Sequence, residues 1–210
     1  MSSSESAPPG ERVFDDIYER AQWGRNRKGL GTSGSGSTLN ATLLYRVFLQ
    51  CLLKANAIRS VVDAGCGDWE FSQTVDWSGI DYKGYDVVER VIVQNTQRFA
   101  AANIQFFHGS VVELDLPAAD LIICKHVLQH LPTRDVQQVL AKLKKYKHIL
   151  LTNGVDHQTL SAPNVDIVAG GYRPLDPTKP PFNLPGVKML TYWDGTYMQQ
   201  VVYSRGENVG

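Results

Sequence analysis

The chain has 210 residues, of which 43% are hydrophobic and 20% charged, a composition typical of a globular protein with a sizeable core. The formal net charge is +0 and the pI is near 7.0, so no overall charge attracts nucleic acid or an anionic membrane. Cys51, Cys66 and Cys124 are far apart and form no Cys-x-x-Cys pair, which argues against a disulfide framework or a zinc site and favours a reducing compartment.

The first ten residues are rich in Ser, Pro and Gly and have nothing to bury, so residues 1–10 are predicted to form a disordered tail. They lack the apolar core of a signal peptide. The longest apolar runs of the chain are only as long as strands, so no segment is expected to span a membrane. These features predict a cytoplasmic protein.

Residues 11–57 are predicted to form a region that caps the core. Apolar positions recur at helical spacing over residues 11–22 and again over residues 39–55, which predicts two amphipathic helices. The broad apolar face of the second helix includes Leu43, Val47 and Leu52. Between the helices, residues 29–38 are almost all Gly, Ser and Thr. This segment is either a flexible linker or a loop that closes over a ligand.

Strand and helix patterns alternate through the core, which is assigned to residues 58–210. The predicted strands are 59–63, 82–86, 104–108, 120–124 and 148–153, and the predicted helices are 69–77, 89–101 and 133–145. Such alternation predicts right-handed crossovers and a parallel sheet with helices on both faces.

Two further segments follow the alternating region. Residues 154–185 are polar and rich in Pro, and so long a loop in a compact domain is usually functional or mobile. Residues 188–193 and 198–205 then pair naturally as a β-hairpin around Asp194-Gly195.

The most informative motif lies where the first core strand ends. Asp63 is followed by Gly65-Cys66-Gly67, a turn that brings a ligand close to backbone N–H groups. A carboxylate beside these groups suits a cationic ligand with its own hydrogen-bonding groups better than a pyrophosphate.

Two other turns are expected at the same edge of the sheet. Asp86 ends the second strand about twenty residues beyond the glycines, where an acid accepts hydrogen bonds from ribose hydroxyls. The Gly109-Ser110 turn follows the third strand. Ligands of open α/β sheets bind outside the carboxyl ends of the strands, so the three turns converge on one crevice.

Over about residues 58–153, these motifs resemble the class I S-adenosylmethionine-dependent methyltransferases. The resemblance implies a doubly wound, seven-stranded, mostly parallel sheet that ends in the hairpin. It also implies that S-adenosylmethionine is the cofactor, with Asp63 near its methionine amino group, Asp86 on its ribose and the Ser110 turn at the edge of its adenine. The other cofactor-binding positions implied in this way are Gly65, Cys66, Gly67, Trp69, Val87, Val111 and Lys125.

The sequence departs from the family at two of these positions. Trp69 stands where a third Gly is common, so a large ring is expected to shape the site. Ser110 replaces the usual acid and contributes no charge. A nicotinamide-dependent enzyme is the competing interpretation. It is disfavoured because Glu70 stands where the dinucleotide motif needs its last Gly, and because Asp63 would repel a pyrophosphate.

Candidate catalytic residues directly follow the fourth strand. If the acceptor must lose a proton, His126 is the first candidate for the general base and His130 the second. They could also bind a metal, but no third ligand is evident, so no metal is expected.

In the long loop, Tyr172 and Arg173 are candidates for substrate binding, and Arg173 would suit a carboxylate or a phosphate. Trp23 could stack on adenine or substrate. Each of these three could instead simply anchor a loop. The lysine-rich residues 142–147 are expected to form a solvated face.

The sequence therefore predicts a methyltransferase that acts on the O or N atom of a small-molecule or sugar-like acceptor. Methylation of a protein or RNA remains an alternative, although nothing in the overall charge favours nucleic acid. A non-catalytic, cofactor-binding partner subunit is the other alternative, because the fold does not guarantee activity. The acceptor and the oligomeric state stay open.

Overall fold

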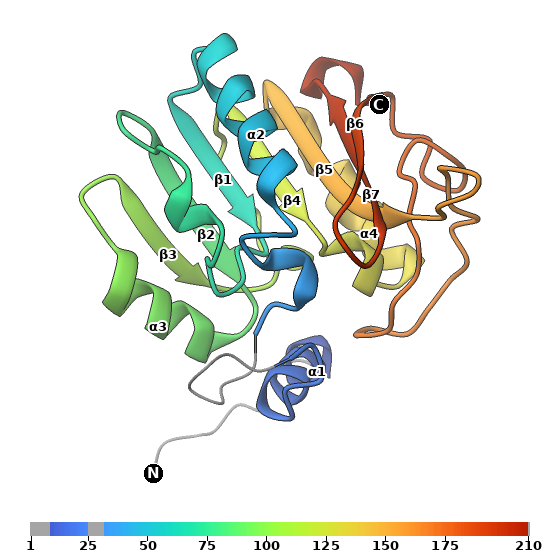
Figure 1. Ribbon diagram of the computed structural model, residues 1–210, viewed down its shortest axis with the longest axis horizontal. Coiled ribbons are helices and arrows are strands. Elements are labelled where there is room, and N and C mark those ends of the chain that lie inside the picture. Colours follow the sequence, from blue (N-terminus) through green and yellow to red (C-terminus); the bar gives the residue numbers. More distant parts are fainter. Residues whose placement is uncertain (1–8, 25–31, 210) are drawn as a thin grey trace.

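The computed structural model describes residues 9–24 and 32–209, which form a seven-stranded sheet flanked by helices (Figure 1). The strands are β1 (Ser60–Ala64), β2 (Asp81–Asp86), β3 (Ile104–His108), β4 (Leu121–Lys125), β5 (His148–Val155), β6 (Val187–Trp193) and β7 (Met198–Ser204). Their order in the sheet is β3-β2-β1-β4-β5-β7-β6, and β7 runs in the direction opposite to the other six strands. The expected seven-stranded, mostly parallel sheet with a terminal hairpin is confirmed.

In the described part of the chain, four α-helices accompany the sheet: α1 (Pro9–Glu19), α2 (Leu43–Ala55), α3 (Glu89–Phe99) and α4 (Thr133–Ala141). Helices α2 and α3 lie in front of the sheet in Figure 1 and α4 lies behind it, while α1 lies beyond the carboxyl ends of the strands. Among the described residues, no helix has the length and apolar character needed to cross a membrane. Of the expected disordered tail, residues 1–10, the first eight lie outside the described part. Residues 9 and 10 belong to α1, so the tail prediction is wrong for these two.

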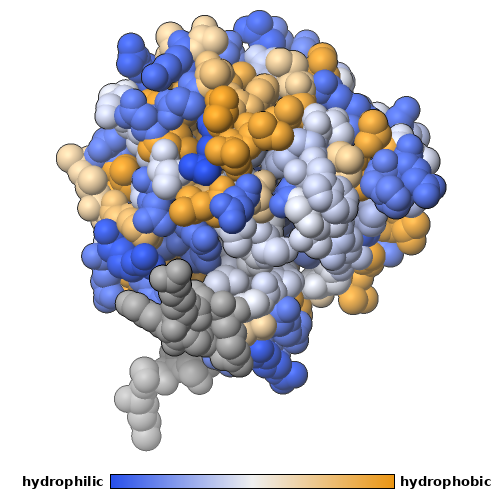
Figure 2. Space-filling view, viewed as in Figure 1, coloured by the Kyte–Doolittle hydropathy of each residue, from blue (hydrophilic) through white to orange (hydrophobic). Residues whose placement is uncertain are grey.

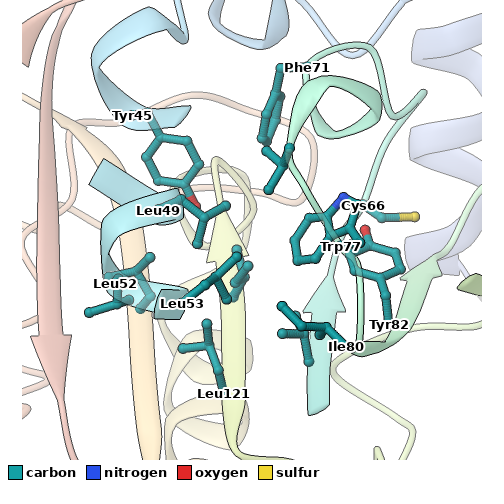
Figure 3. Packing of buried hydrophobic residues seen from close by; sticks show 14 of the residues in the cluster. Tyr45, Leu49, Leu52, Leu53, Cys66, Phe71, Trp77, Ile80, Tyr82 and Leu121 are labelled. Carbon is teal, nitrogen blue, oxygen red and sulfur yellow. The ribbon is translucent and has the colours of Figure 1, made fainter. Parts of the chain in front are cut away.

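The strands are buried on both faces because helices cover both sides of the sheet. In β4, Leu121 and Ile123 belong to the core beneath α2, while Ile122 and Cys124 belong to the core beneath α4. Figure 3 shows Leu49 and Leu53 of α2 packed toward Leu121. The continuous apolar run of β4 therefore serves two cores at once.

The helix expected over residues 69–77 does not form, and a single 3₁₀ turn at Ser72–Thr74 takes its place. Four large side chains of this segment, Trp69, Phe71, Val75 and Trp77, are all buried in the same core cluster. An α-helix would place residues two apart on opposite sides, so it could not turn both Trp69 and Phe71 inward. The irregular backbone does so, helped by the hydrogen bond from Trp77 Nε1 to the Ser72 carbonyl (2.8 Å).

Helix α2 also differs from expectation, because it begins at Leu43 rather than Leu39 and its apolar residues do not form one buried face. Its buried side chains are Tyr45, Leu49, Leu52 and Leu53. In contrast, Leu43 and Val47 are each 58% exposed, and they contribute to the apolar surface over α2 in Figure 2. The other differences are smaller: α3 ends two residues early, and α4 gives way to a 3₁₀ turn at Leu143–Lys145.

Replacing Trp69 tests this account of the core. The indole is 4% exposed and lies 5.6 Å from the ring of Tyr82 and 5.4 Å from that of Phe106. We expect Trp69→Ala to lower the free energy of unfolding by about 3–5 kcal/mol, as for other buried aromatic truncations. Urea denaturation measures the change, and Trp193→Ala is the control because Trp193 is 56% exposed. A wild-type midpoint for Trp69→Ala would contradict a core role.

Candidate functional site

A cavity of about 560 Å³ opens at the carboxyl ends of β1, β2 and β4. The turns that follow these strands supply its floor, and α1 with the segment after it supplies its roof. The residues expected at the cofactor that line it are Asp63, Gly65, Cys66, Gly67, Asp86, Val87, Ser110, Val111 and Lys125. The convergence expected from topology therefore occurs, and the volume lies within the range of about 300–1,000 Å³ usual for small-ligand sites.

Asp63 is the second-last residue of β1, which ends at Ala64, one residue later than expected, and its carboxylate is buried beneath the cavity. Tyr82 donates its hydroxyl to Asp63 Oδ2 (2.7 Å). Burial raises the pKa of Asp63 to about 6, because a charged carboxylate is poorly solvated there. The hydrogen bond from Tyr82 opposes this rise and holds the carboxylate in one orientation.

Asp86 ends β2 and joins that strand to the glycine turn. Its carboxylate accepts hydrogen bonds from the backbone N–H groups of Gly67 (2.9 Å) and Val88 (3.0 Å). Burial raises the pKa of this carboxyl to about 6 as well. Two buried carboxylates thus face one cavity, an arrangement that favours a ligand with positive charge and donor groups.

The glycines of the turn are required by space as well as by backbone conformation. Gly65 has φ +87°, and a Cβ there would lie 2.1 Å from Cγ2 of Val127. Gly67 has φ +56°, and a Cβ there would lie 2.3 Å from Oγ of Ser33. Side chains at these positions would displace the walls of the cavity.

The turn after β3 lines the cavity with Ser110, Val111, Val112 and Glu113. The sequence departure at Ser110 therefore does not leave this wall without an acid, because Glu113 supplies a carboxylate three residues later. Trp69, in contrast, is not among the residues that line the cavity. The indole lies in the core under the glycine turn, so it acts on the site only by supporting that turn.

The part of the Gly/Ser segment that the structure describes, residues 32–38, packs over the carboxyl ends of the strands (Figure 1). The Ser33 hydroxyl accepts a hydrogen bond from the Asp68 N–H (2.7 Å) and also pairs with the Tyr18 hydroxyl of α1 (2.8 Å). Lys125 Nζ donates to the Gly36 carbonyl (2.7 Å). These bonds make residues 32–38 a fixed wall of the cavity rather than a linker; residues 29–31 lie outside the described part.

A second cavity of about 280 Å³ adjoins the first, and both are lined by Trp23, Ser33, His126 and His130. The other residues that line it are Gln22, Gly34, Ser35, Gly36, Gln129, Tyr172, Asp194, Tyr197 and Gln199. The tip of the β6–β7 hairpin, a Gly/Ser wall and the long loop thus meet around a space beside the first cavity. Methyl transfer needs just such neighbouring sites for a donor and an acceptor.

Both ring nitrogens of His126 have hydrogen-bond partners. Nδ1 lies 3.1 Å from Lys125 Nζ, and Nε2 lies 2.6 Å from Gln199 Oε1. Since an amide oxygen only accepts, Nε2 carries the proton and Nδ1 accepts from the lysine. Burial lowers the pKa of His126 well below 6.5, so the ring is neutral. It has no free lone pair for a proton from the acceptor.

His130 has the opposite arrangement. Its Nδ1 lies 2.7 Å from the Gly171 carbonyl oxygen and must donate to it. The Gln129 amide is oriented by its own bond from the Gly154 N–H, so it turns its nitrogen toward His130 Nε2 at 3.3 Å. That contact is long and therefore weak. Burial lowers the pKa of His130 below 6.5, so the ring is neutral at pH 7. Its Nε2 is then unprotonated and can accept a proton, and the ring lines both cavities.

The two loop residues proposed for substrate binding lie in different places. Tyr172 lines the second cavity. Arg173 is 3% exposed, and its guanidinium donates to Thr133 Oγ1 (3.0 Å) and to the carbonyls of Val165 (2.6 Å) and Leu131 (2.8 Å). It lines neither cavity, so the structure assigns it the alternative role of anchoring the long loop.

The lysines of residues 142–147 are not simply a solvated face. Lys142 Nζ bonds carbonyls of the turn after β3, including that of Leu114 (3.0 Å), and Lys147 pairs with Asp120 (2.6 Å). Within residues 9–24 and 32–209, no group of three His, Cys, Asp or Glu side chains is placed to hold a metal ion.

Sequence reasoning missed several residues that line the second cavity. The sequence places Asp194 and Tyr197 in a β-hairpin but predicts no site role for them, and it does not distinguish Gln199 from its neighbours. All three line the second cavity. One signal for Gln199 was available, since Gln199-Gln200 interrupts an otherwise apolar strand. Nothing local reveals that Asp194 meets residues 33–36, because that contact joins distant parts of the chain.

Comparisons with known proteins agree with this geometry. Residues 61–147 match a family model described as a methyltransferase domain. No curated protein matches the chain at the level of sequence.

Solved structures of similar fold cover nearly the whole chain. One is 1,6-didemethyltoxoflavin-N1-methyltransferase from Burkholderia thailandensis, with 1,6-didemethyltoxoflavin and S-adenosylhomocysteine bound (TM-score 0.68, 16% identity, 98% of this chain and 92% of that chain). Another is the N-methyltransferase NodS from Bradyrhizobium japonicum (TM-score 0.66, 13% identity, 91% of this chain and 98% of that chain). A third is magnesium protoporphyrin IX methyltransferase from Synechocystis with bound S-adenosylmethionine (TM-score 0.60, 16% identity, 95% of this chain and 98% of that chain).

These structures share the fold of the present chain, and the family model covers the glycine turn, the β2 acid and the residues after β4. The competing nicotinamide interpretation finds no support in them. Residues 61–147 therefore form a methyltransferase domain, and the chain has the fold of the class I, S-adenosylmethionine-dependent methyltransferases.

Proposed function

We propose that this enzyme binds S-adenosylmethionine in the larger cavity and methylates a small molecule held in the smaller one. The observation that carries the proposal is the junction of the two cavities, which share Trp23, Ser33, His126 and His130. The volume of the second cavity, about 280 Å³, suits a small acceptor better than a segment of a macromolecule. Two proteins of similar fold also carry the names of small molecules, 1,6-didemethyltoxoflavin and magnesium protoporphyrin IX, in their own names as methyltransferases.

The donor cavity fits the cofactor by charge and by hydrogen bonding. S-adenosylmethionine, when bound, would supply a methyl group attached to a positively charged sulfur. An electron-rich acceptor atom would bond to the methyl carbon from the side opposite the sulfur, and the carbon–sulfur bond would break to leave neutral S-adenosylhomocysteine. Asp63 would hold the amino group, and the backbone of Gly65, Cys66 and Gly67 would lie against the methionine part. Asp86 would accept hydrogen bonds from the ribose hydroxyls.

The remaining proposed contacts follow the walls of the donor cavity. Val87, Ser110 and Val111 would surround the adenine, with Ser110 as a hydrogen-bonding group. Lys125 packs over the rings of Tyr45 (5.7 Å) and Phe71 (5.3 Å). Because Lys125 Nζ is tied to the Gly36 carbonyl, its role would be to hold the Gly/Ser wall closed beside the donor.

Of the two histidines, His130 is the better candidate for the general base. Its Nδ1–H donates to the Gly171 carbonyl, which orients the ring and leaves Nε2 as the acceptor. The same logic of a base oriented by a third group operates in many catalytic sites. His126, whose nitrogens are both engaged, would instead connect Lys125 to Gln199 and fix the junction of the cavities.

Substitution of Asp86 tests the donor site. Asp86→Asn keeps one acceptor oxygen but removes the charge, so we expect S-adenosylmethionine to bind about 10- to 100-fold more weakly, as for a lost hydrogen bond to a charged group. Isothermal titration calorimetry measures the affinity. Asp81→Asn is the matched control, since Asp81 lies at the other end of β2 and pairs with Lys83 on the surface. Equal affinities for both variants would refute the ribose contact.

The affinity for S-adenosylmethionine should depend on pH. Burial raises the pKa values of Asp63 and Asp86 to about 6, and a cationic ligand favours their charged forms. Affinity is therefore expected to be constant above about pH 7 and to fall up to about tenfold per pH unit and per carboxyl below about pH 6. Calorimetry across this range measures the change, and Asp63→Asn should make the dependence shallower. A flat profile in the wild-type protein would argue against charged carboxylates at the ligand.

Loss of His130 should slow methyl transfer without weakening donor binding. We expect His130→Gln to reduce the rate about 100-fold or more, the usual contribution of a general base. The rate is measured as transfer of the tritiated methyl group from S-adenosylmethionine to small molecules in a cell extract, namely the fraction that passes through a dialysis membrane. His148→Gln is the control, because His148 lies at the start of β5, far from the carboxyl ends of the strands. Because burial lowers the pKa of His130, the wild-type rate should stay on its plateau until the pH falls below about 6.5.

A further inference from the structure

We infer that the second cavity selects a planar acceptor that carries an amine and discriminates against carboxylic acids and phosphates. This inference rests on the proposed function, since it takes the second cavity as the acceptor site. It goes further by naming the chemical class of the acceptor, and it depends on charge and ring arrangement in residues that no comparison assigns to a ligand.

The charge of the second cavity is negative. Asp194 contributes a carboxylate, and none of the described residues that line this cavity is Lys or Arg. Lys125 lines the donor cavity instead, where its ammonium is tied to the Gly36 carbonyl (2.7 Å). Arg173, the other cation near this region, is buried and bonded within the loop. Lys125 and Asp194 do interact through their charges, but Lys125 is not among the residues that line this cavity and is already bonded to the Gly36 carbonyl. An anionic acceptor would therefore meet the like charge of Asp194 and find no free cation in the lining to pair with.

The Asp194 carboxylate is held in place rather than free to turn away. Oδ1 accepts hydrogen bonds from the backbone N–H groups of Thr196 and Tyr197, both at 2.7 Å. Oδ2 accepts from Gln199 Nε2 at 2.8 Å. Since a carboxylate can accept about four hydrogen bonds, these three leave room for one from a ligand. The position is thus prepared for an ammonium or another N–H donor.

Aromatic rings form one wall of the same cavity. Trp23 and His130 have centroids 4.8 Å apart, His130 and Tyr172 are separated by 6.0 Å, and Tyr172 and Tyr197 by 5.4 Å. The four rings come from the segment after α1, the turn after β4, the long loop and the hairpin. They present π-faces and edges that favour a flat ligand, and these faces also attract a cation.

Another part of the lining is small and polar, which leaves room for such a ligand. It consists of residues 33–36, and a Cβ at Gly36 would lie 2.6 Å from Cε1 of His126 and 3.5 Å from Asp194 Oδ2. The lack of a side chain at Gly36 thus keeps open the space between the histidine and the carboxylate. An amine on Asp194 and a ring against Tyr172 would lie beside His130, at the junction with the donor cavity.

A matched pair of probes tests the inference. Tryptamine and indole-3-acetate share one flat ring system and differ in carrying an ammonium or a carboxylate. Their affinities are measured by calorimetry with the full chain saturated with S-adenosylhomocysteine. We expect tryptamine to bind at least about tenfold more tightly than indole-3-acetate. Asp194→Asn should weaken tryptamine about tenfold, as for a lost charged hydrogen bond, and reduce the difference between the probes.

Asp156→Asn is the matched control variant. Asp156 also accepts backbone N–H groups in a tight turn, from Gln158 (3.1 Å) and Thr159 (2.8 Å), but it lines neither cavity. It should leave both affinities unchanged. Tyr197→Leu, at a ring that is 47% exposed, should weaken tryptamine about threefold without affecting the fold.

The outcomes separate the two proposals. If S-adenosylhomocysteine binds but tryptamine does not, or if indole-3-acetate binds equally well, the acceptor class is wrong while the donor site stands. The same conclusion follows if Asp194→Asn leaves tryptamine binding unchanged. If S-adenosylhomocysteine itself fails to bind, the proposed function fails with the inference. A thermal melt of each variant, with its affinity for S-adenosylhomocysteine, identifies any loss caused by misfolding.

Discussion

The burial of two carboxylates at the carboxyl ends of β1 and β2 is the constraint on which the site depends. Asp63 and Asp86 lose hydration there, and only a few hydrogen bonds replace it: the Tyr82 hydroxyl for one, and the Gly67 and Val88 N–H groups for the other. Burial raises the pKa values of both groups to about 6, so the ligand-free protein carries a cost in stability near neutral pH. A cationic ligand with donor groups relieves that cost, which links the fold directly to the choice of cofactor.

The core supports these carboxylates from below. Tyr82, which bonds Asp63, lies in a cluster of aromatic rings with Trp69, Trp77 and Phe106. This packing explains why the chain does not form a regular helix after the glycine turn. The irregular segment turns both Trp69 and Phe71 into the core, whereas an α-helix would turn one of them outward. The backbone between β1 and β2 is therefore shaped by the core, and the glycine turn is held where Asp86 can accept from it.

The second cavity has a different origin, because it depends on contacts between distant segments. Lys125 joins the end of β4 to Gly36, and the chain of hydrogen bonds continues from His126 through Gln199 to Asp194 on the hairpin. The family fold leaves this part variable, since loops and added segments carry specificity on a common sheet. The charge and the rings of the second cavity thus come from loop, hairpin and N-terminal residues rather than from the sheet itself.

The sequence alone determined the sheet, the donor-side turns and the family, because strand periodicity, Gly-x-Gly spacing and strand-end acids are local patterns. It also brought His126, His130 and Tyr172 into consideration, but it placed His126 before His130 as the general base. The tertiary structure favours the reverse order, because it saturates both nitrogens of His126 and leaves Nε2 of His130 weakly bonded. It also buries Arg173 as a loop anchor. Asp194 reached the second cavity only through folding, because hydrogen-bond partners and cavity walls arise between residues far apart in the chain, where no local pattern records them.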